Sequence, residues 1–515
     1  MTLGHGRYKA RAILTRGSRV VWVGDDPEVA PPHARRLEFD GCSIGPAFVD
    51  AHVHMTSIGV GLTGLDLTFA TSGAEVLDAV ESYAQVHTGR VLWGAGYDPH
   101  DFPDSLPTPA ELTRAAAGRP VYLQRQDGHS ALVDRMTLSA APLARSGGVE
   151  RDAAGEPTGV LRREANQIVR RWTVGAMGHD ELDQARAAAA AHAAAQGIAS
   201  VHEMGGQDIT GVEDFDAWAL GSWPVEVVGY WGGFDLGFVV ERDLRQIGGG
   251  IYLDGSLGSH TAALEQPYAD SHLSGELEYD DETLTELFVE ATAAGIQVAV
   301  HALGDAAIRQ AIRCWRDAAN RLPDYLGDAV RRLHHRLEYG IVMPPDLLDD
   351  IADVGLQVCA VPSHETIWGG AGGMYEQRLG AERLSWTSPL RELADRGVPL
   401  CFGSSGVSNP MDPWTAIHAA EQRHHPRHAI TRLEAVSAHT LGGRNAARQD
   451  RFVGVLRAGM RADLAVFEGD PYGADDPRGT RAVLTMVKGR RTHGHADMPS
   501  WDEDRPPRRE HAEPT

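Results

Sequence analysis

Eight short apolar runs, each followed by a stretch with helical periodicity, occupy most of this 515-residue chain. Apolar strands that alternate with amphipathic helices are typical of parallel βα units, whose sheets are covered by helices. Eight units predict an α/β fold built on a TIM-like (β/α)₈ barrel, with the functional side chains at the carboxyl ends of the strands. The expected strands are residues 44–51, 198–203, 225–231, 251–255, 296–301, 332–338, 356–362 and 399–403.

Other segments fall outside these units. Short β-like runs occur in residues 1–43 and 454–495. Runs 12–15 and 19–24 are expected to pair with the distant runs 462–467 and 482–489, so both ends of the chain would form one small composite β-domain. The barrel then spans 44–453. A stretch at about 57–170 is too long for one βα loop, so it predicts a subdomain inserted over the barrel mouth. Residues 497–515 are rich in proline and charge and are expected to be disordered.

Composition excludes several classes of partner. A formal net charge of −23 argues against binding to nucleic acid or to an anionic membrane. No stretch has the length and purity of a membrane helix, and the N-terminus lacks the apolar core of a signal peptide. The four cysteines have no CxxC spacing and are interpreted as buried thiols. We therefore expect a cytoplasmic protein that acts on a small molecule. The sequence leaves open whether two copies of the chain form a homodimer.

The first expected barrel strand ends in two histidines separated by one residue, His52 and His54. Side chains alternate between the two faces of a strand, so both imidazoles are expected on one face while Val53 lies on the other. Two imidazoles on one face at a strand end are suited to chelating a single divalent metal. The pair therefore predicts a metal site at the barrel mouth.

The residues around this pair, 45–55, resemble the first strand of the metal-dependent amidohydrolase superfamily. The similarity is to the family 3 branch, which contains N-substituted formamide deformylases and D-aminoacylases. It extends in order through residues 94–98, 120–130, 155–161, 253–264, 300–307, 335–338 and 454–467. The resemblance therefore covers most of the chain and implies the barrel, the composite β-domain and a metal-dependent hydrolase.

The resemblance also implies a ligand set and a reaction. His301 matches the histidine that ends the fifth strand, so His52, His54 and His301 are the expected ligands of one divalent metal, Zn²⁺ by preference. Metal-bound hydroxide would attack the carbonyl of a small amide, formamide or cyclic amide and break its C–N bond. Three positions depart from the family, which often has lysine at Gly250, histidine at Tyr339 and aspartate at Ser405. The alternative is thus a catalytically impaired relative that binds a small ligand.

Candidates for acid–base chemistry come from the ends of the other strands. Glu338 is the best candidate acid and His335 the best candidate base, whereas Ser405 occupies the position of the family's proton-shuttling aspartate. Further candidates are His202, Glu203, Asp254 and Asp305. A serine-hydrolase site at Ser256 or Ser259 is disfavoured, because neither lies in a G-x-S-x-G motif.

Overall fold

The computed structural model describes residues 10–99, 102–126, 130–143, 147–207, 209–326, 328–406 and 411–494. The tail expected to be disordered, 497–515, lies outside the described residues. Within the described ranges, no helix combines the length and the apolar character needed to cross a bilayer.

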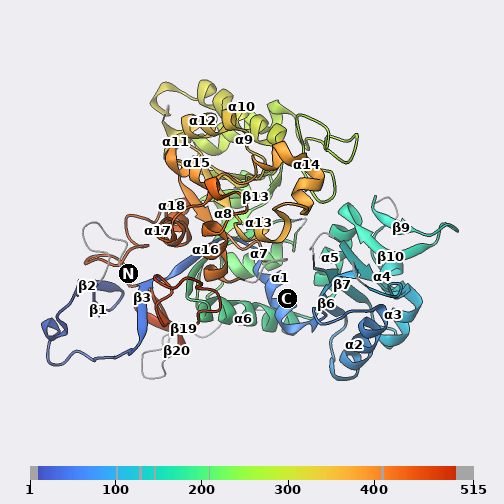
Figure 1. Cartoon of the computed structure of the whole chain (residues 1–515), viewed down its shortest axis with the longest axis horizontal. Helices are drawn as coiled ribbons and strands as arrows, with labels where there is room; N and C mark the ends of the chain where they lie inside the picture. The colour runs from blue at the N-terminus through green and yellow to red at the C-terminus, as the bar shows by residue number, and fades with distance from the viewer. Residues whose placement is uncertain are drawn as a thin grey trace, which may run out of the picture.

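Eight parallel strands form a nearly closed barrel, which confirms the predicted fold class (Figure 1). Their order around the sheet is β17-β16-β15-β14-β13-β12-β11-β4. At the seam between the first and last strands, the backbone N–H of Ser405 donates to the carbonyl of His52 at 2.8 Å. The strands are β4 (Phe48–Val53), β11 (Ile198–Gly205), β12 (Glu226–Trp231), β13 (Gln246–Tyr252), β14 (Gln297–Ala302), β15 (Arg336–Tyr339), β16 (Gln357–Ala360) and β17 (Leu400–Phe402).

Helices follow the strands and pack on the outside of the barrel (Figure 1). Their ends carry the expected signals: Asp280 caps α9 by accepting from Thr283 N at 2.8 Å, and Gly355 ends α12 in the left-handed region at φ 80°. The helices are α6 (His179–Ala195), α7 (Val212–Ala219), α8 (Leu236–Glu241), α9 (Asp281–Ala293), α10 (Asp305–Arg321), α11 (Ala329–Arg332), α12 (Pro345–Val354), α13 (Ser363–Trp368), α14 (Met374–Leu384), α15 (Leu390–Asp395), α16 (Pro413–Glu421), α17 (Arg432–Ser437) and α18 (Gly443–Ala446).

Three strands begin four or more residues away from their predicted start. The first was expected from residue 44, but β3 (Cys42–Pro46) belongs to the terminal sheet and the barrel strand β4 begins at Phe48. The fourth was expected at 251–255, but β13 begins at Gln246 and includes the glycine run 248–250, which the predicted strand left out. A Cβ at Gly248 would lie 1.8 Å from the carbonyl oxygen of Ala299, so glycine allows the close approach of β13 to β14 there. The sixth was expected from residue 332, but α11 covers that position and β15 begins at Arg336.

Helix α1 (Met55–Thr63) leaves the first barrel strand directly after the histidine pair and packs tightly on α6. A Cβ at Gly59 would lie 2.0 Å from the carbonyl oxygen of Ala185, so only glycine fits at this contact. The alanine-rich face of α6, including Ala189 and Ala193, is buried in the same core. Small residues on both helices therefore fix the course of the chain after His54.

The inserted segment forms its own six-stranded sheet in the order β5-β6-β7-β8-β10-β9. Helix α1 lies between this sheet and the barrel (Figure 1). The strands are β5 (Leu65–Asp66), β6 (Leu92–Tyr97), β7 (Val121–Arg125), β8 (Ser130–Val133), β9 (Val149–Arg151) and β10 (Pro157–Arg162), and the helices are α2 (Gly73–Val86), α3 (Pro109–Ala115), α4 (Arg135–Ala140) and α5 (Arg163–Ala176).

The two ends of the chain share a four-stranded sheet in the order β20-β19-β18-β3. Strand β3 (Cys42–Pro46) pairs antiparallel with β18 (Leu464–Glu468), followed by β19 (Ala482–Val487) and β20 (Arg490–Gly494). The expectation that runs 12–15 and 19–24 pair with distant strands was wrong, because β1 (Ala12–Arg16) and β2 (Arg19–Gly24) form a hairpin with each other. That hairpin still contacts the C-terminal segment, since Val20 N donates to the carbonyl of Met460 at 2.9 Å.

Candidate metal-hydrolase site

His52 and His54 lie where β4 ends and α1 begins, with ring centroids 5.7 Å apart. The Nδ1–H of His52 donates to Glu338 Oε2 at 2.6 Å, and that of His54 donates to the carbonyl of Met204 at 2.8 Å. Burial is the main cause that holds the pKa of His54 well below its usual value, and the positive charge of Arg170 adds to it. Because an acceptor engages Nδ1 in both rings, each Nε2 keeps a lone pair, as in histidines that bind metals.

His301 lies on β14 and is separated from His52 by an aromatic ring. The ring of Tyr339 has its centroid 4.7 Å from that of His301 and 4.9 Å from that of His52. Tyr252 packs on His301 with a centroid distance of 4.7 Å. The three histidines therefore surround one region at the carboxyl ends of the strands, with Tyr339 between two of them.

The imidazole nitrogens of these histidines are suited to one divalent cation. However, the three side chains are too far apart in this structure to form a coordination sphere. Among the described residues, one group of three has its ligand atoms within 4.8 Å of each other, and that group is His52, Glu338 and Cys359. His54 and His301 are not part of it. A cation held by His52, His54 and His301 would have to draw their imidazoles closer than they stand here.

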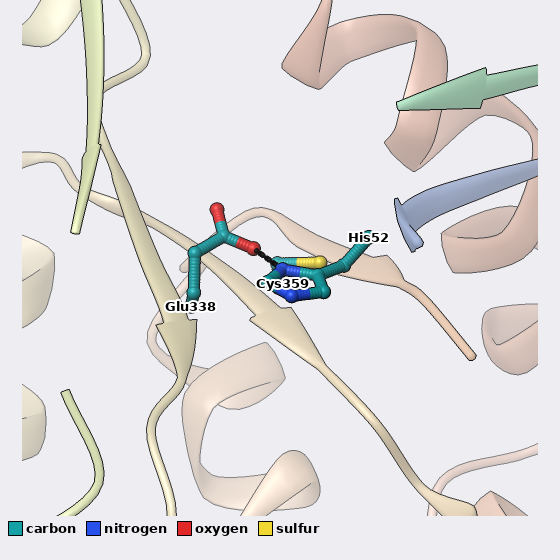
Figure 2. Close-up of side chains that lie close together, drawn as sticks. All are labelled: His52, Glu338 and Cys359. Atoms are coloured by element: carbon teal, nitrogen blue, oxygen red, sulfur yellow. Dashed lines mark hydrogen bonds and ion pairs between the residues drawn. The ribbon is translucent and has the colours of Figure 1, made fainter. Parts of the chain in front are cut away.

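Figure 2 shows His52, Glu338 and Cys359, which reach one another from three different barrel strands. By spacing alone they are a candidate metal site. However, ligand atoms on a tetrahedral zinc lie about 3.3 Å apart, whereas His52 Nδ1 and Glu338 Oε2 are 2.6 Å apart. That distance is a hydrogen bond with a proton between the two atoms. We interpret Glu338 as the carboxylate that orients His52.

Arg336 supports this interpretation, because its guanidinium pairs with both oxygens of Glu338. Its Nε lies 2.7 Å from Oε1, and its Nη2 donates to Oε2 at 2.9 Å. Burial opposes ionisation of Glu338, but Arg336 and the hydrogen bond from His52 outweigh it and hold the pKa of Glu338 below its usual value. A fully buried, ionised and paired carboxylate does not fit the predicted role of general acid.

Arg336 also ties the site to the barrel interior. Its Nη1 donates to His202 Nδ1 at 2.9 Å and to the hydroxyl of Tyr230 at 2.8 Å, and its Nη2 donates to the carbonyl of Ala51 at 2.6 Å. Burial and Arg336 hold the pKa of His202 well below its usual value. His202, predicted as a substitute ligand or base, is thus engaged in a structural network.

Tyr339 and Ser405 occupy two of the three positions where the chain departs from the family pattern, and they bond to each other. The Tyr339 hydroxyl and Ser405 Oγ are 2.8 Å apart. Both residues have left-handed backbones, with φ 70° at Tyr339 and φ 62° at Ser405. Asparagine, aspartate and histidine are the non-glycine residues most often found in this region, so the backbone suits the family's residues better than those present.

The prediction that His335 is a catalytic base was wrong in its placement. His335 precedes β15, and its Nδ1 accepts from the backbone N–H of Val298 at 2.9 Å, near the amino end of β14. Its Nε2 lies 3.1 Å from Thr292 Oγ1. Burial lowers the pKa of His335 to about 3, and the ring is fully enclosed, at the end of the barrel opposite the mouth.

The other predicted acids are held by backbone N–H groups. Asp254 accepts from Ala263, Leu303 and Gly304, and burial raises its pKa to about 7. Glu203 accepts from Met55 N at 2.8 Å, and burial raises its pKa well above its usual value. Asp305 accepts from Glu265 N and Ala306 N. Ser256 and Ser259 bond to each other at 2.8 Å.

An eight-stranded barrel with histidines at the carboxyl ends of its strands is the architecture that the resemblance to metal-dependent amidohydrolases predicts. Residues 40–493 match the model of the Amidohydrolase family, and the chain belongs to that family. It is 28% identical over 485 residues to amidohydrolase YtcJ of Bacillus subtilis (86% of this chain, 87% of the relative). It is 25% identical over 529 residues to an N-substituted formamide deformylase of Arthrobacter pascens (93% and 94%).

Its fold is similar to the crystal structure of an uncharacterized metal-dependent hydrolase from Pyrococcus furiosus. The TM-score is 0.72 at 26% identity, covering 89% of this chain and 95% of that one. Together, the family match and these relatives identify the chain as a hydrolase of carbon–nitrogen bonds.

Sequence reasoning did not include two arginines, Arg336 and Arg170, among the residues of the site. Arg336 and Glu338 are two apart on one strand and so share a face, and this spacing was a usable signal for their pairing. Arg170 acts on His54 from helix α5, and no local pattern marks it.

Proposed function

We propose that this chain hydrolyses a non-peptide C–N bond in a small amide, formamide or cyclic amide, using one divalent cation held by His52, His54 and His301. The observation that carries the proposal is the occupied Nδ1 of His52 and of His54, which leaves both Nε2 atoms as ligands. A carboxylate and a backbone carbonyl are the usual outer partners of metal-binding histidines. The formamide deformylase and the metal-dependent hydrolase among the relatives support this reaction class.

Zinc is the metal that we propose, because three neutral imidazoles leave a fourth tetrahedral position open. When bound, it would supply Lewis acidity toward the scissile carbonyl. Tyr339 and Ser405 share one hydrogen bond, so one hydroxyl proton of the pair is left to polarise that carbonyl oxygen. Ser405 is not an anionic base, and neither Glu338 nor His335 replaces the missing aspartate.

A second candidate function is ligand binding without efficient hydrolysis. The Tyr339 ring packs against His52, His301 and also His364, whose centroid is 5.6 Å away. This packing, together with Gly250 in place of the family's lysine, favours a site that has lost part of its metal chemistry.

The test is a panel of N-substituted formamides, N-acyl amides and lactams, assayed with the native chain, after chelator treatment and after zinc is restored. We expect at least one substrate to be hydrolysed, with activity lost on chelation and recovered with zinc. Turnover that survives chelation would contradict the metal-dependent proposal. Binding of panel compounds without turnover would instead support the second candidate.

A further inference from the structure

A small hollow of about 210 Å³ lies between helix α1, the sheet of the inserted segment and the loop after β17. Ser57 and Ile58 line it from α1, Trp93 and Gln124 from the inserted sheet, and Gly406 from the loop. Pockets for drug-sized molecules are about 300–1,000 Å³, so this hollow suits one arm of a ligand.

Two buried N–H donors in this hollow have no acceptor. Among the described residues, the indole Nε1 of Trp93 and the amide Nε2 of Gln124 make no hydrogen bond, although their side chains are almost fully buried. Strands β6 and β7 pair with Ala95 opposite Gln124, which places Trp93 and Gln124 on the same face of the sheet. Buried donors normally have partners, so two that face one hollow indicate an acceptor supplied by a ligand.

Ser57 adds a third donor to the hollow, and its hydroxyl contacts the positively charged guanidinium of Arg170. Its Oγ accepts from Arg170 Nη2, which leaves the hydroxyl proton for another acceptor. Arg170 forms no ion pair in the described part of the chain. In addition, its Nε is buried without a hydrogen-bond partner. A half-buried guanidinium without a carboxylate favours an anionic ligand.

The described residues that complete the lining carry no negative charge that would repel an anion. Within the described ranges, no aspartate or glutamate lines the hollow. His192 lines it from α6, and burial lowers the pKa of this histidine, with Asp412 opposing. Ile58, Leu62 and Met411 supply apolar surface for the carbon skeleton of a ligand.

The hollow also lies beside the histidines. Ile58 N donates to the carbonyl of His54 at 3.1 Å, so the lining begins one helical turn after a proposed metal ligand. On the other side, Gly406 directly follows Ser405. A group bound in the hollow would therefore hold the adjoining part of the same molecule toward the histidines.

We propose that this hollow binds the carboxylate of the substrate through Trp93 Nε1, Gln124 Nε2 and the Ser57 hydroxyl, with Arg170 supplying the balancing charge. This assignment of a substrate class rests on the proposed function. It implies that the amide that is hydrolysed carries a carboxylate and a short apolar arm. Gln124 and Trp93 are binding residues in this proposal and take no part in bond cleavage.

The test is calorimetric titration of the chain with hippurate, an amide that bears a carboxylate, and with its neutral analogue hippuramide. We expect hippurate to bind about tenfold or more tightly than hippuramide, because hydrogen bonds to a charged acceptor are the stronger ones. Gln124→Met and Trp93→Phe should each weaken hippurate binding about tenfold, since each removes a donor to the carboxylate. Gln124→Met should do so without lowering the melting temperature, because it replaces an N–H that has no protein partner.

Trp315→Phe is the matched control, because its indole Nε1 is equally buried and unpartnered but lies in the core between α9 and α10. It should leave hippurate binding unchanged. Equal binding of hippurate and hippuramide, or hippurate binding unaffected by Gln124→Met and Trp93→Phe, would overturn the carboxylate site even if the chain hydrolyses amides. Hippurate binding that both variants weaken, without turnover of any amide, would support the carboxylate site and reject the proposed hydrolysis.

Discussion

Replacing Glu338 with alanine is expected to lower the free energy of unfolding by about 3–5 kcal/mol, because it leaves Arg336 charged and unpaired in the barrel interior. Both side chains are fully buried, and the guanidinium contacts both carboxylate oxygens. The same change removes the acceptor that fixes the Nδ1–H of His52. Chemical denaturation with two independent probes measures the effect.

The double variant Arg336→Met with Glu338→Leu is the informative comparison, because removing both charges avoids the penalty of an unpaired one. It should recover much of the stability lost by Glu338→Ala. Glu265→Ala, which breaks the exposed pair with Arg309, should cost less than about 1 kcal/mol. If Glu338→Ala proves no more costly than Glu265→Ala, the network described around Arg336 is wrong.

Restoring the family's residues at two positions is expected to raise hydrolysis. Ser405→Asp places a carboxylate beside the histidines, and general-base assistance contributes about 10²–10⁴-fold to kcat/KM. Tyr339→His replaces the ring between His52 and His301 with an imidazole that can serve as a ligand. Aspartate and histidine both tolerate the left-handed backbone found at 405 and 339. The double variant should bind zinc more tightly and hydrolyse N-acyl substrates faster than the native chain.

Ser405→Asn is the control, because asparagine has the shape of aspartate and suits the same backbone but cannot accept a proton near pH 7. It should give no gain. A native chain that hydrolyses its substrate well and is slowed by Ser405→Asp would show that the base lies elsewhere.

The barrel was predictable because each strand is an apolar run followed by a helix of regular period. The error at β13 has a physical cause: Gly248, Gly249 and Gly250 look like a break, yet they permit a close backbone approach inside the strand. The hairpin of β1 and β2 was also misassigned, because β-like runs do not specify their partners when a local turn and a distant strand compete.

The site was only partly predictable. Local spacing was enough to select His52 and His54, since a strand's two-residue period places them together. It was not enough for His335, whose position before β15 depends on where the strand begins. Contacts between strands far apart in sequence, such as Glu338 with His52, cannot be read from local pattern. The same holds for the hollow between α1 and the inserted sheet, whose residues come from five separate segments.

The most direct test of the account is the amount of metal bound per chain, measured by elemental analysis after mild dialysis. We predict no more than about one transition-metal ion per chain, because Gly250 and Ser405 offer neither a bridging lysine nor a carboxylate for a second ion. His52→Ala and His54→Ala should each remove it, whereas the exposed His424→Ala should not. Two tightly held ions, or one ion that persists in both His52→Ala and His54→Ala, would contradict a single metal centre at these histidines.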